Sequence, residues 1–238
     1  MKLDILVIAA HPDDAELGCG GTIAKQIDAG FKVGILDLTK GELGTRGNEE
    51  TRKKEAETAA IILGLSLREN AGLPDGFFEN TIAERKVIMQ YVRKYKPEIV
   101  ITNAPTDRHP DHGRAANLVY DACFLSGLTK IETTDEHGLQ QPWRPPFFYH
   151  FIQSAYISPD FIVDISAYWQ IKMNAIKAFS TQFYSGKTEG QQTFISRPEF
   201  LDFVEARAIE MGSIAGVKYA EGFIAKRYPM LNLLTDIK

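Results

Sequence analysis

The chain has 238 residues, of which 44% are hydrophobic and 24% charged, the balance of an ordinary water-soluble globular protein. Its mild net charge of −4 argues against nucleic acid as a partner, and no stretch approaches the roughly 20 apolar residues that a membrane span needs. We recognise no signal peptide, and we therefore expect a single cytoplasmic domain over residues 1–238. The chain has only two cysteines, Cys19 and Cys123, and we expect both to be reduced and buried.

Apolar runs of strand length alternate with segments of helical character along the chain. Uninterrupted apolar runs are typical of strands buried on both faces, as in a parallel sheet. Helix ends are marked most clearly by Asn48, a plausible N-cap, and by Gly64, a natural stop. The expected strands are 3–10, 32–39, 65–69, 98–103, 147–153 and 160–165. The expected helices are one that follows Gly20–Thr22 and ends at Gly30, and those at 48–64, 81–95, 112–125, 167–179 and 198–215.

This alternation predicts an α/β protein, a Rossmann-like three-layer fold with a mainly parallel sheet flanked by helices. Two segments stand apart from the pattern. Residues 127–146 are polar and rich in proline, and we expect an insertion or an oligomer contact there. Residues 184–196 carry glycine and polar side chains, and we expect a mobile loop over the functional site.

Two polar motifs follow predicted strands. His11 to Asp14 (HPDD) ends the first strand, and His109 to His112 (HPDH) follows the strand at 98–103 after a short loop. Ligands of parallel sheets bind beyond the carboxyl ends of the strands, so the fold gives a reason for the two motifs to meet. We therefore predict one catalytic metal site built from both.

Histidine nitrogen and carboxylate oxygen suit zinc, and a catalytic zinc commonly keeps three protein ligands and one open position. His11 and Asp14 are three residues apart, so that one tight turn can aim both at an ion, and His112 is a candidate for the third ligand. Asp13 would then be free to act as general base on a water molecule. A closed structural site that used all four candidate side chains would leave Asp13 and Asp111 as unpaired charges without a role.

His109 would lie near the developing oxyanion, where its protonated form could stabilise charge and give a proton to the leaving group. Asp111 would orient His109 and favour its charged form. Arg52 and Arg108 are further candidates, because arginine suits recognition of carboxylate or phosphate groups, although each could instead be a solvated surface charge.

The two motifs together resemble those of the zinc-dependent N-acetylglucosamine deacetylases of the LmbE/PIG-L family. Further stretches are similar to the branch that acts in bacillithiol biosynthesis, and they extend over nearly the whole chain except 127–146. These stretches are 41–47 (GELGTRG), 72–76 (GLPDG), 107–114 (DRHPDHGR), 161–165 (FIVDI), 180–183 (STQF) and 219–223 (YAEGF).

The resemblance implies one zinc ion per chain, held by His11, Asp14 and His112. Only the resemblance selects His112 as the ligand of the second motif, and iron would also fit two histidines and one aspartate. It assigns Asp13 as the general base, and it makes His109 the acid or oxyanion stabiliser. Asp111 would support His109 in that task.

The branch implies N-acetylglucosaminyl malate as substrate, hydrolysed to glucosaminyl malate and acetate, and it suggests a homo-oligomer. The two carboxylates of malate would give Arg52 and Arg108 a task as substrate-binding residues. Three alternatives stay open: a deacetylase for another N-acetyl sugar or a thiol conjugate, a metal-dependent phosphoesterase, and a non-enzymatic metal- or nucleotide-binding module.

Overall fold

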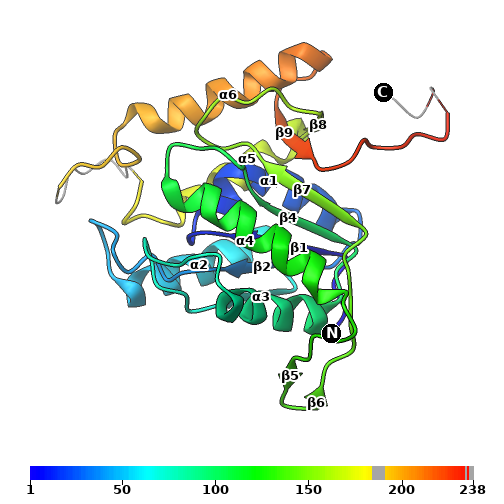
Figure 1. Ribbon diagram of the computed structural model, residues 1–238. Coiled ribbons are helices and arrows are strands. Elements are labelled where there is room, and N and C mark those ends of the chain that lie inside the picture. Colours follow the sequence, from blue (N-terminus) through cyan, green and yellow to red (C-terminus); the bar gives the residue numbers. More distant parts are fainter. Residues whose placement is uncertain (184–190, 234, 236–238) are drawn as a thin grey trace.

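A seven-stranded sheet forms the centre of the computed structural model, which describes residues 1–183, 191–233 and 235 (Figure 1). Its strands are β1 (Ile5–Ala9), β2 (Val33–Asp37), β3 (Leu67–Asn70), β4 (Ile99–Asn103), β7 (Phe147–Phe151), β8 (Phe161–Asp164) and β9 (Ala220–Ala225). The order is β3-β2-β1-β4-β7-β9-β8. The first five strands in this order run parallel, whereas β9 is antiparallel to both its neighbours.

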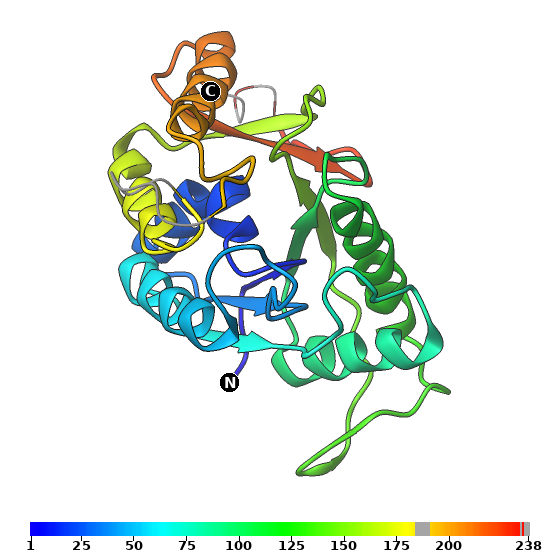
Figure 2. The ribbon, with the colours of Figure 1, turned by 90° about the vertical axis from the view of Figure 1, so that its left-hand side faces the viewer.

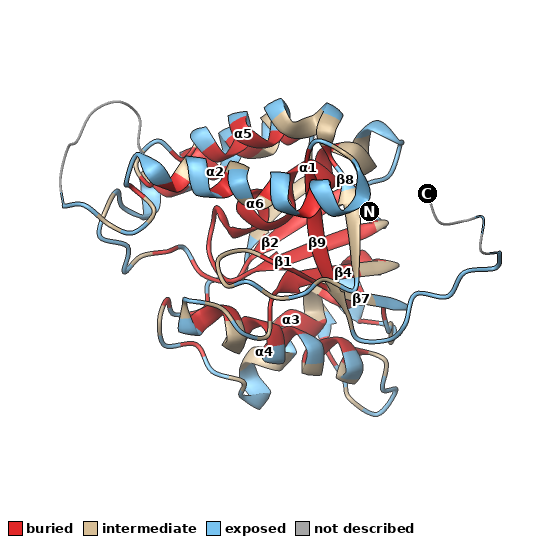
Figure 3. Ribbon diagram, turned by 90° about the horizontal axis from the view of Figure 1, so that it is seen from above, coloured by how far each residue is buried: buried red, intermediate tan, exposed pale blue. Residues whose placement is uncertain are grey.

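Helices cover both faces of the sheet (Figures 2 and 3). One face carries α1 (Asp14–Asp28), α2 (Glu49–Leu63) and α5 (Trp169–Lys177). A short 3-10 helix at Ser166–Tyr168 precedes α5, and α6 (Glu199–Ala215) packs against β8 and β9. The other face carries α3 (Ile82–Tyr95) and α4 (Pro110–Ser126).

The alternation of side chains along β1 divides the apolar residues between two cores. Ile5, Val7 and Ala9 pack on the side of α1 and α2, whereas Leu6 and Ile8 pack on the side of α3 and α4. An uninterrupted apolar run is therefore what a central strand of this sheet requires, and the predicted three-layer α/β fold is confirmed.

Most predicted elements are present, with ends that differ by a few residues. The Asn48 side chain accepts from the N–H of Thr51, and Gly64 has a φ of 77°, so both ends of α2 were predicted correctly. Strand β9 was missed because Glu221 and Gly222 interrupt its apolar pattern. Residues 127–146, expected to be irregular, include a small hairpin of β5 (Thr134–Asp135) and β6 (Gly138–Leu139).

Of the segment 184–196, expected to be a loop over the site, residues 184–190 lie outside the described part of the chain. The remainder, from residue 191, leads towards α6. None of the helices in the described ranges has the length and apolar character needed to cross a membrane.

Helix α1 is interrupted at Cys19, whose φ of −146° is not helical. The two backbone N–H groups of residues 21 and 22 donate to the carboxylate of Glu221 at 3.0 and 2.7 Å. Lys172 donates to the same carboxylate at 2.6 Å and to a carbonyl of the helix before the break at 2.8 Å. This buried ion pair therefore caps both halves of α1 and fixes the direction of its first turns, which begin with Asp14.

Gly18 is needed where α1 crosses the sheet. A Cβ at this position would lie 2.1 Å from the buried ring of Phe151, whereas a Cβ at Gly20 would meet its nearest neighbour at 3.4 Å. We expect Gly18→Ala to lower the free energy of unfolding by about 1–3 kcal/mol or more, because the core must shift. Gly20→Ala is the matched control and should change it by less than about 1 kcal/mol. Equal effects in urea unfolding would contradict this account of the packing.

Candidate metal centre and active site

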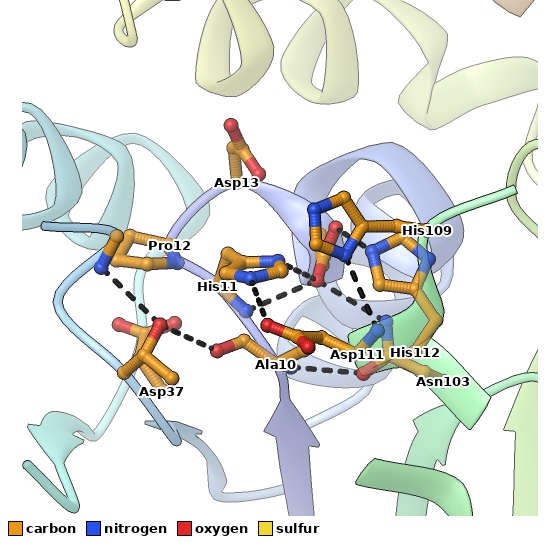
Figure 4. Close-up of polar contacts among 12 residues, drawn as sticks. Ala10, His11, Pro12, Asp13, Asp37, Asn103, His109, Asp111 and His112 are labelled. Atoms are coloured by element: carbon orange, nitrogen blue, oxygen red, sulfur yellow. Dashed lines mark hydrogen bonds and ion pairs between the residues drawn. The ribbon is translucent and has the colours of Figure 1, made fainter. Parts of the chain in front are cut away.

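The two motifs meet at the carboxyl ends of β1 and β4, which are neighbours in the sheet. From β1 the sheet continues to β2 on one side and to β4 on the other, so that strand order reverses at this point, where ligands bind in such folds. Figure 4 shows His11, His109 and His112 gathered there, with Asp13 on the turn that leads into α1. His109 is the N-cap of α4, and Pro110 occupies its first turn.

Asp14 lies between His11 and His112. Its Oδ2 is 3.3 Å from His11 Nδ1, and its Oδ1 is 3.2 Å from His112 Nε2. Ligand distances of about 2.0–2.2 Å place neighbouring donors of a tetrahedral ion about 3.3 Å apart, so the spacing of Asp14 from each histidine suits a zinc-sized cation, through a different carboxylate oxygen in each case. Asn103 and Gln153 donate to the two oxygens of Asp14 at 3.2 and 2.8 Å and hold its orientation.

The charges around the two imidazoles also suit a cation. Burial lowers the pKa of both rings, but the facing carboxylates outweigh it: the pKa of His11 is raised well above its usual range and that of His112 to about 9. Metal ions compete with protons for the same nitrogen lone pairs. A pocket that attracts protons this strongly is therefore also suited to a divalent ion.

A second group of candidate ligands lies on the other side of His11. Its Nε2 is 3.0 Å from Asp75 and 3.2 Å from Asp111. The oxygens of these carboxylates also accept hydrogen bonds from backbone amides and from Arg114. We interpret this group as the support of the His11 ring rather than as a second metal site, because its oxygens are already occupied by donors.

Asp13 has a φ of 118°, a conformation that costs a residue other than glycine of order 1–3 kcal/mol and that is common at functional sites. Its Oδ2 accepts from Arg52 Nη2 at 3.1 Å. Burial raises the pKa of Asp13 to about 7, and neighbouring carboxylates add to the effect while Arg52 opposes it. A carboxylate with a pKa close to neutrality can both take and return a proton.

His109 accepts the backbone N–H of Asp111 at its Nδ1, at 3.3 Å, so that in the neutral ring Nε2 carries the proton. Burial lowers the pKa of His109, and the charges of the other two imidazoles lower it further. The Asp111 carboxylate raises the pKa of His109, as expected, but the net effect favours the neutral ring, and a charged His109 in the reaction stays a prediction. The contacts of Asp111 differ from expectation, because its carboxylate contacts His11 and Arg114, and only its backbone contacts His109.

The two arginines occupy different environments. Arg52 is buried, and it donates to Asp13 and to the carbonyls of Pro12 and Gly41. It is therefore a partner of the Asp13 turn, and because it also lines the cavity described below, its expected contact with a substrate carboxylate stays a prediction. Arg108 is exposed, and its guanidinium lies 4.5 Å above the ring of Phe194.

A cavity of about 410 Å³ opens above these groups, enough for a small glycoside. His11, Asp13, Asp14, His109 and His112 form its floor. Its walls come from three loops, namely 43–45, 75–76 and 193–195, together with Arg52, Arg108, Gln153, Ser154 and Gln182. The described end of the segment 184–196 thus lies beside the site, as expected.

A second cavity, of about 490 Å³, lies between α2 and the ends of β2 and β3. Its buried charges are paired, since Arg68 contacts Asp37 of the same lining at 2.7 Å and Glu16, which lies behind the lining, at 2.5 Å. It contains none of the histidines. The cavity above the metal site is therefore the one equipped for chemistry.

Sequence reasoning missed the residues that hold the site residues in place. Asp107 contacts His112, Asp75 contacts His11, and Asn103 and Gln153 contact Asp14. Asp75 and Asp107 stand inside two of the stretches that carry the family resemblance. Asn103 is the last residue of β4 and Gln153 lies two residues beyond β7, so their position at the strand ends was the available signal.

Three candidate ligands, a buried carboxylate with a pKa near neutrality and an imidazole donor at one cavity define a metal-dependent hydrolytic site. Residues 6–123 match the family described as PIG-L, GlcNAc-PI de-N-acetylase. The chain is also 30% identical to the diacetylchitobiose deacetylase of Thermococcus kodakarensis, with 92% of this chain and 81% of that protein covered. The chain belongs to the PIG-L family and is an N-deacetylase, an enzyme that hydrolyses amide bonds.

Two further comparisons bear on the fold and on the substrate. The conserved protein TT1542 from Thermus thermophilus has a solved structure with 37% identity and a TM-score of 0.86, and 98% of each chain is covered. The probable N-acetyl-alpha-D-glucosaminyl L-malate deacetylase 2 of Bacillus subtilis is 27% identical, with 76% of this chain and 84% of that protein covered. The family resemblance is thus confirmed, whereas the particular branch stays a prediction.

Proposed function

We propose that this protein removes the N-acetyl group from N-acetylglucosaminyl malate, giving glucosaminyl malate and acetate, and that it does so in the cytoplasm as a homo-oligomer with one zinc ion per chain. The main support for hydrolysis is the position of Asp13, because this buried carboxylate has a strained backbone and lies on the floor of the same cavity as the candidate ligands. A carboxylate that only stabilised the fold would not need a costly backbone conformation at this position.

His11, Asp14 and His112 would hold the ion, and zinc there would supply Lewis acidity, which polarises the acetyl carbonyl and lowers the pKa of the attacking water. Asp13 takes the proton from the attacking water. The same carboxyl group then returns this proton to the departing amine nitrogen, which leaves as the free amine of the sugar. No covalent acyl-enzyme is needed.

His109 stabilises the charge that develops on the acetyl oxygen. Its Nδ1 is engaged by the amide of Asp111, so Nε2–H is the donor available to the cavity. A preorganised donor of this kind commonly contributes about 10²- to 10³-fold to kcat. The role of oxyanion donor therefore fits the hydrogen bonding of His109 better than the role of a charged acid.

Arg108 is our candidate for the malate end of the substrate. It lies at the exposed side of the cavity, stacked on Phe194, and no carboxylate of the described ranges forms an ion pair with its guanidinium. The named activity of the Bacillus subtilis relative supports this choice of substrate. The similarity to a diacetylchitobiose deacetylase makes an acetylated disaccharide the main alternative.

Exchange of the two arginines for methionine separates their roles. Arg52→Met should lower kcat by about tenfold or more with little change in KM, because Arg52 acts through Asp13. Arg108→Met should raise KM by a similar factor and leave kcat nearly unchanged. Steady-state kinetics on N-acetylglucosaminyl malate measure both. If Arg52→Met raised KM and left kcat unchanged, Arg52 would be a substrate-binding residue.

A substrate panel tests the proposed function. Metal-replete protein would be assayed for free amine with N-acetylglucosaminyl malate, diacetylchitobiose, N-acetylglucosamine and a mercapturate, and for free phosphate with a phosphate monoester. We expect the malate conjugate to have the highest kcat/KM, and the gain over N-acetylglucosamine should disappear in Arg108→Met. A higher kcat/KM for diacetylchitobiose would refute the substrate but keep the deacetylase. Hydrolysis of a phosphate ester alone would favour the phosphoesterase, which commonly needs two metals.

A further inference from the structure

Asp107 contacts the candidate metal ligand His112, and its side chain is only 1% exposed. His112 Nδ1–H donates to Asp107 Oδ2 at 2.6 Å. The other oxygen, Oδ1, accepts the backbone N–H of Ala155 at 2.6 Å and that of Arg108 at 2.7 Å. Asp107 thus joins the loop after β4 to the segment after β7 and to His112.

This contact decides which nitrogen of His112 faces the ion. An ionised carboxylate only accepts hydrogen bonds, so the proton must be on Nδ1 and the lone pair on Nε2. His112 Nε2 is the atom that lies 3.2 Å from Asp14. Backbone N–H groups also donate to both oxygens of Asp107, at 2.7 and 2.6 Å to Oδ1 and at 3.5 Å to Oδ2, so this side chain is an acceptor on both sides.

His11 shows the mirror arrangement. Its Nε2 is engaged by Asp75 and Asp111, so that Nδ1 is left to face Asp14. The two histidines therefore present opposite ring nitrogens, each fixed by a carboxylate outside the ligand set. We propose that Asp107 is a positioning residue that fixes the tautomer and the ring orientation of His112, so that Nε2 is presented to the metal ion. The inference rests on the proposed function only in that an ion binds at this site.

The substitution Asp107→Asn gives a sharp test, because it changes the hydrogen bonding of the side chain but not its shape. The N–H groups of residues 108 and 155 require an acceptor and therefore keep the remaining oxygen on their side. The amide NH₂ then faces His112 Nδ1 and favours the tautomer with the proton on Nε2. We expect the affinity for zinc to fall by about 10- to 100-fold or more, measured by competition with a chromogenic chelator.

Asp107→Ala and Glu55→Gln serve as the comparisons. Alanine removes the carboxylate without enforcing a tautomer, so Asp107→Ala should bind zinc more tightly than Asp107→Asn. Glu55 is a buried carboxylate that also ties a loop, through the backbone and hydroxyl of Thr181, but it contacts no histidine. Glu55→Gln should therefore keep the wild-type affinity for zinc.

Two results would overturn the proposal. The first is a zinc affinity of Asp107→Asn that lies within about twofold of the wild type or above that of Asp107→Ala. If Asp107 only tied the loop, asparagine would keep that contact and would preserve zinc binding better than alanine. The other needs no variant: nitrogen-15 NMR of the zinc-loaded wild type that finds Nδ1 of His112 bound to the metal. These readouts use no substrate, so loss of the proposed activity with the expected affinities would refute the function and leave this inference intact.

Discussion

Asp13→Asn is expected to bind metal as the wild type does and to lose about 10²- to 10⁴-fold in kcat. Asparagine has the same shape as aspartate and tolerates positive φ better than most residues, so the φ of 118° can be kept. Its amide oxygen can still accept from Arg52. The amide cannot take a proton from water, however, and the chemical step therefore lacks its base.

Asp13→Gly is the matched variant, because glycine removes both the base and the backbone strain. It should be as inactive as Asp13→Asn if proton transfer is the role of this residue. Metal content by mass spectrometry and kcat by release of free amine measure both properties. Recovery of more than about a tenth of the wild-type kcat in either metal-loaded variant would contradict the general-base assignment.

Asp14→Ala is expected to fold but to be isolated with metal far below one ion per chain, and to be inactive for that reason. Asp14 is the carboxylate whose oxygens lie 3.3 and 3.2 Å from the two histidine ligands. Without it the ion loses the only anionic member of the proposed ligand set. Excess zinc should restore activity only in part, in contrast to Asp13→Asn, whose defect should not respond to added metal.

The alternative set for the ion is the three histidines, since ring nitrogens of His11, His109 and His112 lie within 4.8 Å of one another. Stoichiometric metal in Asp14→Ala would therefore mean that His109 is a ligand. Adding His109→Ala to Asp14→Ala separates the cases, because it would then abolish the remaining metal binding. On our account the double variant binds no less metal than Asp14→Ala alone.

Sequence patterns predicted the fold well where one strand borders two cores. The apolar run of β1 places alternate residues in two different cores. A strand buried on both faces is the element for which an uninterrupted apolar run is typical. Strand β9 could not be predicted, because Glu221, its second residue, caps the break in α1. That requirement arises only from the tertiary structure.

The gathering of the candidate ligands could be predicted from the sequence, whereas the residues that support them could not. Two strand ends at the same edge of a sheet were enough to bring His11, Asp14 and His112 together. Which carboxylate supports which histidine depends on side-chain directions within loops, and the expected pairing of Asp111 with His109 was wrong for that reason. The contact between Arg52 and Asp13 could not be predicted either, since no sequence pattern indicates it.

The most direct test of the account compares chelator-stripped protein with protein reloaded with one zinc ion per chain, both incubated with N-acetylglucosaminyl malate. We predict that only the reloaded protein releases acetate and free amine, in equal amounts, and that Asp13→Asn reloaded in the same way releases neither at a comparable rate. Equal release by stripped and reloaded protein would contradict the metal-dependent mechanism, and no release by fully reloaded wild type would contradict the proposed substrate.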